Sequence, residues 1–198
     1  MKQAALGFRA HSGWTALVAV SLDSGSPKVL LRQRPHLVKT FTYEFRQPYH
    51  TAETRSLAEA RPFISQVQAE ATSLACQSIS SAQVDLQNQG YELNHCSVLL
   101  ASGRPLPELA QILASHALIH TADGELFREA LRHASEYCGC AMFSIREREL
   151  LKTASQVLDQ QPDELTHRLA DLGRPLGPPW SQDEKLAALV AWLSLISK

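Results

Sequence analysis

The chain has 198 residues, of which 44% are hydrophobic and 20% charged, and 19 Lys and Arg against 20 Asp and Glu leave a formal net charge of −1. This much apolar sequence is enough for one buried core, so the composition excludes a chain that is disordered along its whole length. The near-zero charge does not support a nucleic-acid binder that depends on a large positive excess, although it does not exclude a local basic patch.

We expect neither a secretory segment nor a membrane span, because no apolar run approaches the roughly 18 residues that a spanning helix requires. The cysteines form neither a disulfide framework nor the paired C-x-x-C pattern of a zinc site. They are Cys76, Cys96, Cys138 and Cys140. Free thiols fit a reducing compartment, so we expect a cytoplasmic protein.

The first forty residues predict three antiparallel strands. Stretches rich in apolar residues cover residues 4–10, 14–22 and 28–38, and the turn sequences Ser12-Gly13 and Asp23 to Pro27 separate them. Residues 46–50 are polar and contain Pro48, which predicts irregular chain there.

A long helix is predicted next. Ser56 and Glu59 have the spacing of a capping box, in which each side chain binds the other residue's backbone N–H. Gly90 is expected to end the helix. Apolar residues recur between them at helical spacing, at Ile64, Val67, Ala71 and Leu74.

The second half predicts two more strands joined by helices. The apolar run 96–101 is typical of a central strand buried on both faces. A short helix over 106–113 and a helix from the cap Thr121 to Tyr137 follow, then a strand over 140–143. Ser144 and Glu147 have capping-box spacing and predict a helix that runs to about residue 158.

The tail predicts two helices around a spacer. Residues 162–172 are helical, residues 174–179 are rich in Pro and Gly, and Ser181 and Glu184 form a capping box for a last helix. That helix is apolar almost all round, so either its own domain or a second copy must cover it. We expect an α/β domain over residues 1–160 and a helical C-terminal extension over 161–198.

The order of elements over residues 4–158 resembles the ribonuclease H-like fold, which ribonucleases H, Holliday-junction resolvases and the halves of actin-like ATPases share. The segment from Leu6 to Thr15 looks like the first hairpin of that fold. The resemblance implies an α/β protein with a five-stranded mixed sheet, made of three antiparallel strands and two helix-linked strands.

The resemblance does not extend to the metal-binding carboxylates of the nucleases. Nucleases of this fold carry one on the first strand, where this chain has Arg9 and His11, and residues 1–22 contain no acidic residue. They carry another near the end of the fourth strand, where this chain has Ala101-Ser102-Gly103. Two-metal catalysis needs several such carboxylates, so the sequence does not support that mechanism.

In a sheet of this order, the first and fourth strands are neighbours whose connections leave in opposite directions, which opens a crevice at their carboxyl ends. A phosphorylated or other anionic small molecule, or a partner, is the expected ligand, with Arg104 as the anion clamp. The alternative interpretation is that these are ordinary turns, since Gly and Ser favour turns regardless of a ligand. The residues expected to line the crevice are Arg9, His11, Ser12, Gly13, Ser102, Gly103 and Arg104.

A second candidate site follows from His116 and His120, which are four residues apart and share a face in a helix. With Glu125 or Asp123 they could ligate one divalent metal ion. If Thr121 caps the next helix, its N-terminus and Asp123 could instead form a site for an anion or polar ligand. A purely structural role for these residues is the third interpretation.

Three hypotheses about function remain open at this point. The first is a non-nuclease domain that binds an anionic ligand in the crevice. The second is a hydrolase in which His120 and Glu125 are catalytic, with a single divalent metal also held by His116. The third is an interaction protein that forms a homodimer through residues 181–197.

Overall fold

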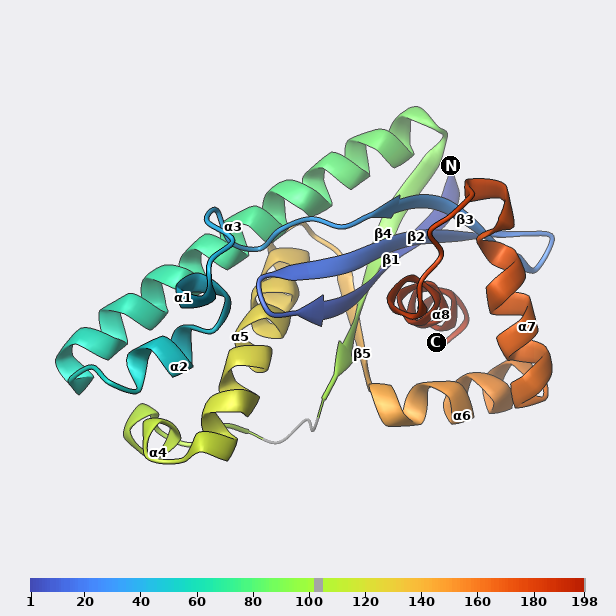
Figure 1. Cartoon of the computed structure of the whole chain (residues 1–198). Helices are drawn as coiled ribbons and strands as arrows, with labels where there is room; N and C mark the ends of the chain where they lie inside the picture. The colour runs from blue at the N-terminus through green and yellow to red at the C-terminus, as the bar shows by residue number, and fades with distance from the viewer. Residues whose placement is uncertain (102–104, 198) are drawn as a thin grey trace.

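A five-stranded mixed sheet lies at the centre of the computed structural model, which describes residues 1–101 and 105–197 (Figure 1). The strand order is β3-β2-β1-β4-β5; β1, β2 and β3 are antiparallel neighbours, and β4 is parallel to both β1 and β5. This confirms the predicted fold class. The strands are β1 (Lys2–His11), β2 (Trp14–Asp23), β3 (Ser26–Gln33), β4 (Tyr91–Leu100) and β5 (Ala141–Arg146).

Helices cover both faces of the sheet. Alternate residues of β1 point to opposite faces: Leu6 and Phe8 pack with the apolar residues of α3 and α5, whereas Ala5 packs with α8. Shorter helices flank these layers (Figure 1). The helices are α1 (Tyr43–Arg46), α2 (Pro48–Ala52), α3 (Leu57–Asn88), α4 (Leu109–Leu113), α5 (His116–Tyr137), α6 (Glu147–Leu158), α7 (Pro162–Leu172) and α8 (Gln182–Ile196).

Two of the predicted capping boxes are present. The backbone N–H of Ser56 donates to Glu59 Oε2 over 3.1 Å at the start of α3. The backbone N–H of Ser181 donates to Glu184 Oε2 over 2.6 Å at the start of α8. Each pairing satisfies backbone groups that a helix end otherwise leaves without a partner, so these helices begin where the sequence predicts.

Two further predicted helix starts, at Thr121 and Ser144, are wrong. Thr121 is not a cap: α5 already begins at His116 after Ser115, and the Thr121 hydroxyl donates to the Ala117 carbonyl over 2.9 Å. Ser144 lies inside β5, and α6 begins at Glu147. Ser144 is paired with β4 in the sheet, so the chain remains an extended strand at the residue that was predicted to cap the helix.

Residues 46–50 are also more regular than predicted. Most of this stretch belongs to α1 and α2, and Pro48 takes the first position of α2. A proline is tolerated there because the N–H that it lacks would have no helical partner anyway.

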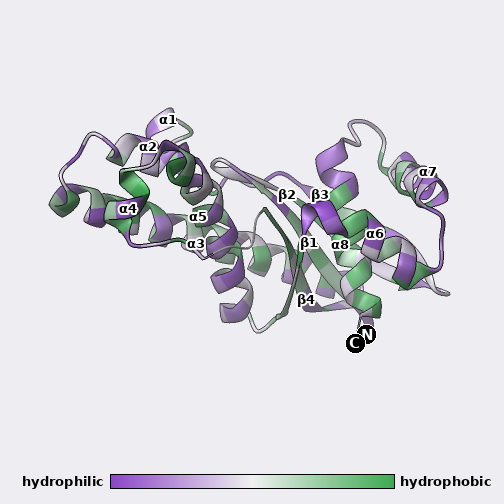
Figure 2. Cartoon of the chain, turned by 90° about the horizontal axis from the view of Figure 1, so that it is seen from below, coloured by the Kyte–Doolittle hydropathy of each residue, from purple (hydrophilic) through white to green (hydrophobic). Residues whose placement is uncertain are grey.

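The apolar helix α8 packs on β1, β2 and β4 of its own chain. It approaches so closely that a Cβ on Gly7 would lie 1.9 Å from the Ala187 carbonyl oxygen. Figure 2 shows the largely hydrophobic colouring of this helix beside the strands. A homodimer through residues 181–197 stays a prediction, and it would have to use the surface that this packing leaves exposed. Among the described residues, no helix combines the length and apolar character that crossing a membrane needs.

Candidate functional site

Arg9, at the carboxyl-terminal part of β1, faces α6 and α8 and lies between two carboxylates. Its Nε and Nη2 donate to Glu147 over 2.9 and 2.8 Å, and its Nη1 donates to Asp183. Glu147 is the first residue of α6, and Asp183 lies in the first turn of α8. The hydrogen bond to Glu147 is the main cause that raises the pKa of Arg9, against the opposing effect of burial. We call Arg9, His11, Glu147 and Asp183 the β1-end cluster.

His11 joins this cluster from the end of β1. Its Nε2 lies 3.2 Å from Asp183 Oδ1, and its ring stacks on Trp14 with 4.1 Å between centroids. The Arg34 guanidinium also lies on the Trp14 ring, 3.5 Å from its centroid. Burial lowers the pKa of His11, and the carboxylate of Asp183 opposes that effect only in part.

Ser12 and Gly13 form the turn between β1 and β2, as predicted from their sequence. Gly13 has a φ of +82°, which favours glycine. Arg46 Nε donates to the Ser12 carbonyl over 3.2 Å, and its guanidinium lies 4.5 Å from the Phe41 ring centroid. His36 stacks on the same Phe41 ring. Cationic and aromatic side chains therefore lie beside this turn.

Arg34 and Arg46 differ from Arg9 in their ion pairs with carboxylates. Within the parts of the chain that the structure describes, no carboxylate forms an ion pair with Arg34 or Arg46. A cavity of about 350 Å³ opens beside Trp14 and Arg34. Asp183 and Glu184 also line it, but Asp183 pairs with Arg9 and Glu184 closes the α8 capping box.

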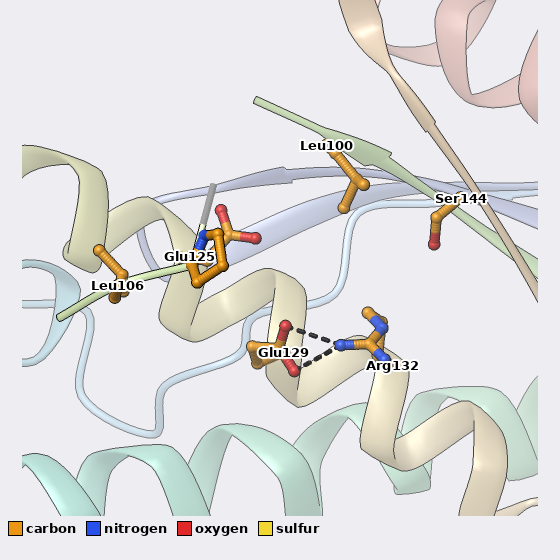
Figure 3. A pocket seen from close by; sticks show the side chains of 7 residues that line it. Leu100, Leu106, Glu125, Glu129, Arg132 and Ser144 are labelled. Carbon is orange, nitrogen blue, oxygen red and sulfur yellow. Dashed lines mark hydrogen bonds and ion pairs between the residues drawn. The ribbon is translucent and has the colours of Figure 1, made fainter. Parts of the chain in front are cut away.

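The other side of the predicted crevice, Ser102, Gly103 and Arg104, lies outside the described residues. Nearby, a cavity of about 520 Å³ is lined by the ends of β4 and β5 and by one face of α5 (Figure 3). Glu125 lies in this cavity and pairs with Arg128 over 3.4 Å, while Glu129 pairs with Arg132.

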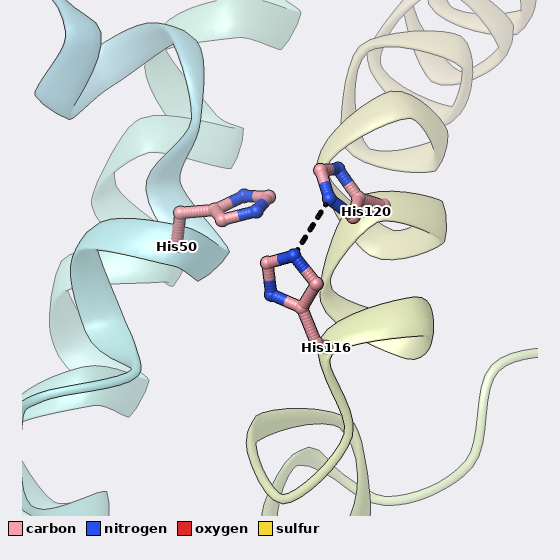
Figure 4. Close-up of side chains that lie close together, drawn as sticks. All are labelled: His50, His116 and His120. Atoms are coloured by element: carbon pink, nitrogen blue, oxygen red, sulfur yellow. Dashed lines mark hydrogen bonds between the residues drawn. The ribbon is translucent and has the colours of Figure 1, made fainter.

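A second group, which we call the histidine cluster, consists of His50 on α2 and His116 and His120 on α5 (Figure 4). One ring nitrogen of each residue lies within 4.8 Å of the others. The Nε2 atoms of His116 and His120 are 3.0 Å apart, and the centroid of the His50 ring is 4.4 Å from that of His120. The structure thus brings together two of the predicted metal ligands, His116 and His120, and adds His50.

Asp123 lies behind His50 instead of facing a ligand. Its carboxylate accepts hydrogen bonds from the Tyr49 backbone N–H over 2.7 Å and from His50 Nδ1, with only 5% of the side chain exposed. Burial raises the pKa of Asp123, although both hydrogen bonds oppose this effect.

Glu125 is not brought to the histidine cluster. A helix turns about 100° per residue, so Asp123 lies on nearly the same side of α5 as His116, whereas Glu125 lies on the opposite side. The prediction grouped Glu125 or Asp123 with the two histidines, and neither carboxylate joins the group of ligand atoms. His50, Glu147 and Asp183 were missed, because each reaches its site through contacts between distant parts of the sequence.

No protein-family model matches the sequence, and no curated protein matches it. Two solved structures of RuvC from Thermus thermophilus are similar in fold. One, in complex with a Holliday junction substrate, has a TM-score of 0.52, and the other has a TM-score of 0.50. Each is 10% identical, and the alignment covers 98% of this chain and 93% of the RuvC chain. At this identity the likeness concerns the fold alone: the chain has the ribonuclease H-like fold.

Proposed function

We propose that this protein is a non-nuclease ribonuclease H-like domain that binds a phosphorylated, anionic ligand at the end of β1. The observation that carries the proposal is the position of Arg9 between Glu147 and Asp183. Nucleases of this fold place a metal-binding carboxylate on the first strand. Here a guanidinium pairs with both neighbouring carboxylates, so they do not form the free carboxylate set that two-metal catalysis needs.

Arg34 and Arg46 are the side chains that would bind the anionic ligand. Arg9 is already paired with two carboxylates, and Arg104, the expected clamp, lies outside the described residues. Arg34 and Arg46 have no carboxylate partner among the described residues. A guanidinium presents a planar fork of donors that matches phosphate oxygens. Trp14 and Phe41 hold these forks by stacking against the two guanidinium groups.

The test measures how ligands shift the melting temperature of the wild type, Arg34→Ala, Arg46→Ala and Arg61→Ala. Arg61 is an exposed residue of α3 and serves as the matched control. The ligands are inorganic phosphate, nucleoside triphosphates, and single-stranded and branched DNA. A ligand at about 100 times its Kd adds about 2.7 kcal/mol of stability. We expect a ligand-induced rise in the wild type and Arg61→Ala that is reduced in the other two variants.

Incubation of the same DNA with Mg²⁺ or Mn²⁺ tests the non-nuclease part, and we expect no cleavage. Cleavage by the wild type that is lost in Asp183→Asn would contradict the proposal. A ligand-induced shift that neither Arg34→Ala nor Arg46→Ala reduces would place the binding site elsewhere.

The two alternatives receive less support. A hydrolase in which His120 and Glu125 act together conflicts with their positions, because Glu125 lies in the cavity beside β4 and pairs with Arg128. Assembly through residues 181–197 has little apolar surface available, since residues 187–194 are buried in the chain's own core.

A further inference from the structure

We infer that His50, His116 and His120 form a site for one divalent transition-metal ion, best suited to Zn²⁺, with a fourth coordination position open to solvent. This inference is independent of the anion site at the end of β1. Three neutral imidazoles and one exchangeable water are a known donor set for zinc with an open position. The three rings come from two elements that the fold brings together, α2 and α5.

The spacing of the ring nitrogens fits such an ion. Ligands about 2.0–2.1 Å from a tetrahedral zinc lie about 3.3 Å from one another. The Nε2 atoms of His116 and His120 are 3.0 Å apart, and the ligand atoms of all three residues lie within 4.8 Å. His116 and His120 are exposed, so small rotations of their side chains can close the remaining difference.

Asp123 orients His50 toward the other two rings. His50 Nδ1 is bonded to the Asp123 carboxylate, so its Nε2 carries the free lone pair and is the atom left for a metal. The Asp123 carboxylate is itself fixed by the Tyr49 backbone N–H. Metal-binding histidines commonly have such a carboxylate behind them, because it sets the tautomer and the ring direction. Asp123 is therefore a positioning residue.

Ring nitrogens of the three histidines converge on one small space. Of the two Nε2 atoms that lie 3.0 Å apart, one must carry a proton for the contact to be a hydrogen bond. The Nε2 of His50 adds a further lone pair to the same small space. A cation would satisfy all three lone pairs at once. Imidazole favours Zn²⁺, Cu²⁺ and Ni²⁺ over Mg²⁺ and Ca²⁺, which prefer oxygen ligands.

The experiment titrates the full-length, EDTA-treated and dialysed protein with Zn²⁺ by calorimetry, and with Co²⁺ by visible absorption. The variants are His116→Ala, His120→Ala and Asp123→Asn, with His133→Ala as the control. His133 is an exposed histidine on the same helix, outside the cluster. We expect one equivalent of metal in the wild type and in His133→Ala, and a Co²⁺ spectrum of nitrogen and oxygen ligands.

Removing either exposed ligand is expected to raise the Kd at least 100-fold. Asp123→Asn should raise it about 10–100-fold, as is typical when the partner of a ligating histidine is lost. Melting curves without metal show whether each variant is folded. Because His116 and His120 are exposed, their alanine variants should melt close to the wild type.

Three results would each overturn the inference. The first is the absence of saturable Zn²⁺ binding to the wild type at micromolar metal. The second is binding by folded His116→Ala and His120→Ala that equals the wild type. The third is a sulfur-to-metal charge-transfer band with Co²⁺ that disappears in Cys138→Ser, which would place the metal on the thiols. Phosphate binding that depends on Arg34 would be unaffected by any of these results, so the two proposals fail separately.

Discussion

Arg9 balances two carboxylates that would otherwise repel each other. In Arg9→Ala, Glu147 and Asp183 lose their shared cation. Because the Glu147 side chain is 40% exposed, solvent screens part of the effect. We expect a loss of about 1–2 kcal/mol in the free energy of unfolding, and a partial recovery in millimolar Mg²⁺.

Urea denaturation with and without Mg²⁺ measures both effects. Arg146→Ala is the control, because it breaks an exposed pair with Glu149 and should cost less than about 1 kcal/mol. Equal losses in the two variants would show that the β1-end cluster contributes no more than a surface ion pair.

His11 makes the stability depend on pH. Its pKa in the folded protein is lowered by burial, so the unfolded chain binds a proton more readily than the folded one. The stability from neutral His11 is therefore present above its unfolded pKa of about 6.5 and is lost as the pH falls through the folded pKa. The free energy of unfolding, measured by urea denaturation between pH 7.5 and 5, should fall less steeply with decreasing pH in His11→Gln than in the wild type. Identical slopes in the two proteins would contradict this role of His11.

At the scale of elements, α8 packs closely on β1, and Gly7 permits this contact. A Cβ on Gly7 would meet the Ala187 carbonyl, which is backbone and cannot rotate away. Gly7→Ala should therefore destabilise the protein by about 1–3 kcal/mol.

Gly124→Ala is the comparison for Gly7→Ala, because it is not expected to destabilise the protein. Gly124 lies in α5, and a Cβ there would meet only the flexible end of Arg128. Alanine is a better helix former than glycine by about 1 kcal/mol, so the melting temperature should rise or stay unchanged. A Gly7→Ala variant as stable as the wild type would show that α8 is free to move outward.

Capping-box motifs predicted helix starts correctly where no tertiary hydrogen bond competed with them. The capping boxes at Ser56 and Ser181 both start helices, because each motif satisfies backbone groups within four residues. The same motif at Ser144 failed, since the hydrogen bonds of β5 with β4 extend through it. The difference is a tertiary partner that the sequence window around Ser144 does not contain.

For the whole molecule, the C-terminal helix completes the core. Residues 187–193 of α8 are each at most 1% exposed, against the face formed by β1, β2 and β4. Removing residues 181–198 would expose that face, so we expect the truncated chain to lose its cooperative thermal transition and its near-ultraviolet circular dichroism. A truncated chain that melts cooperatively and only halves its size in light scattering would favour the homodimer instead.

Sequence alone indicated the order of most elements, because apolar periodicity and turn chemistry act between residues that are close in the chain. The resemblance of that order to the ribonuclease H-like fold then implied the fold class, which the structure confirms. The sequence also indicated His116 and His120, which one helix places on one face. Only the tertiary structure decided which side chains contact Arg9 and the histidine cluster. Arg9 finds carboxylates 138 and 174 residues away, and His50 reaches Asp123 across 73 residues. Such contacts depend on how the layers pack, which no local pattern encodes.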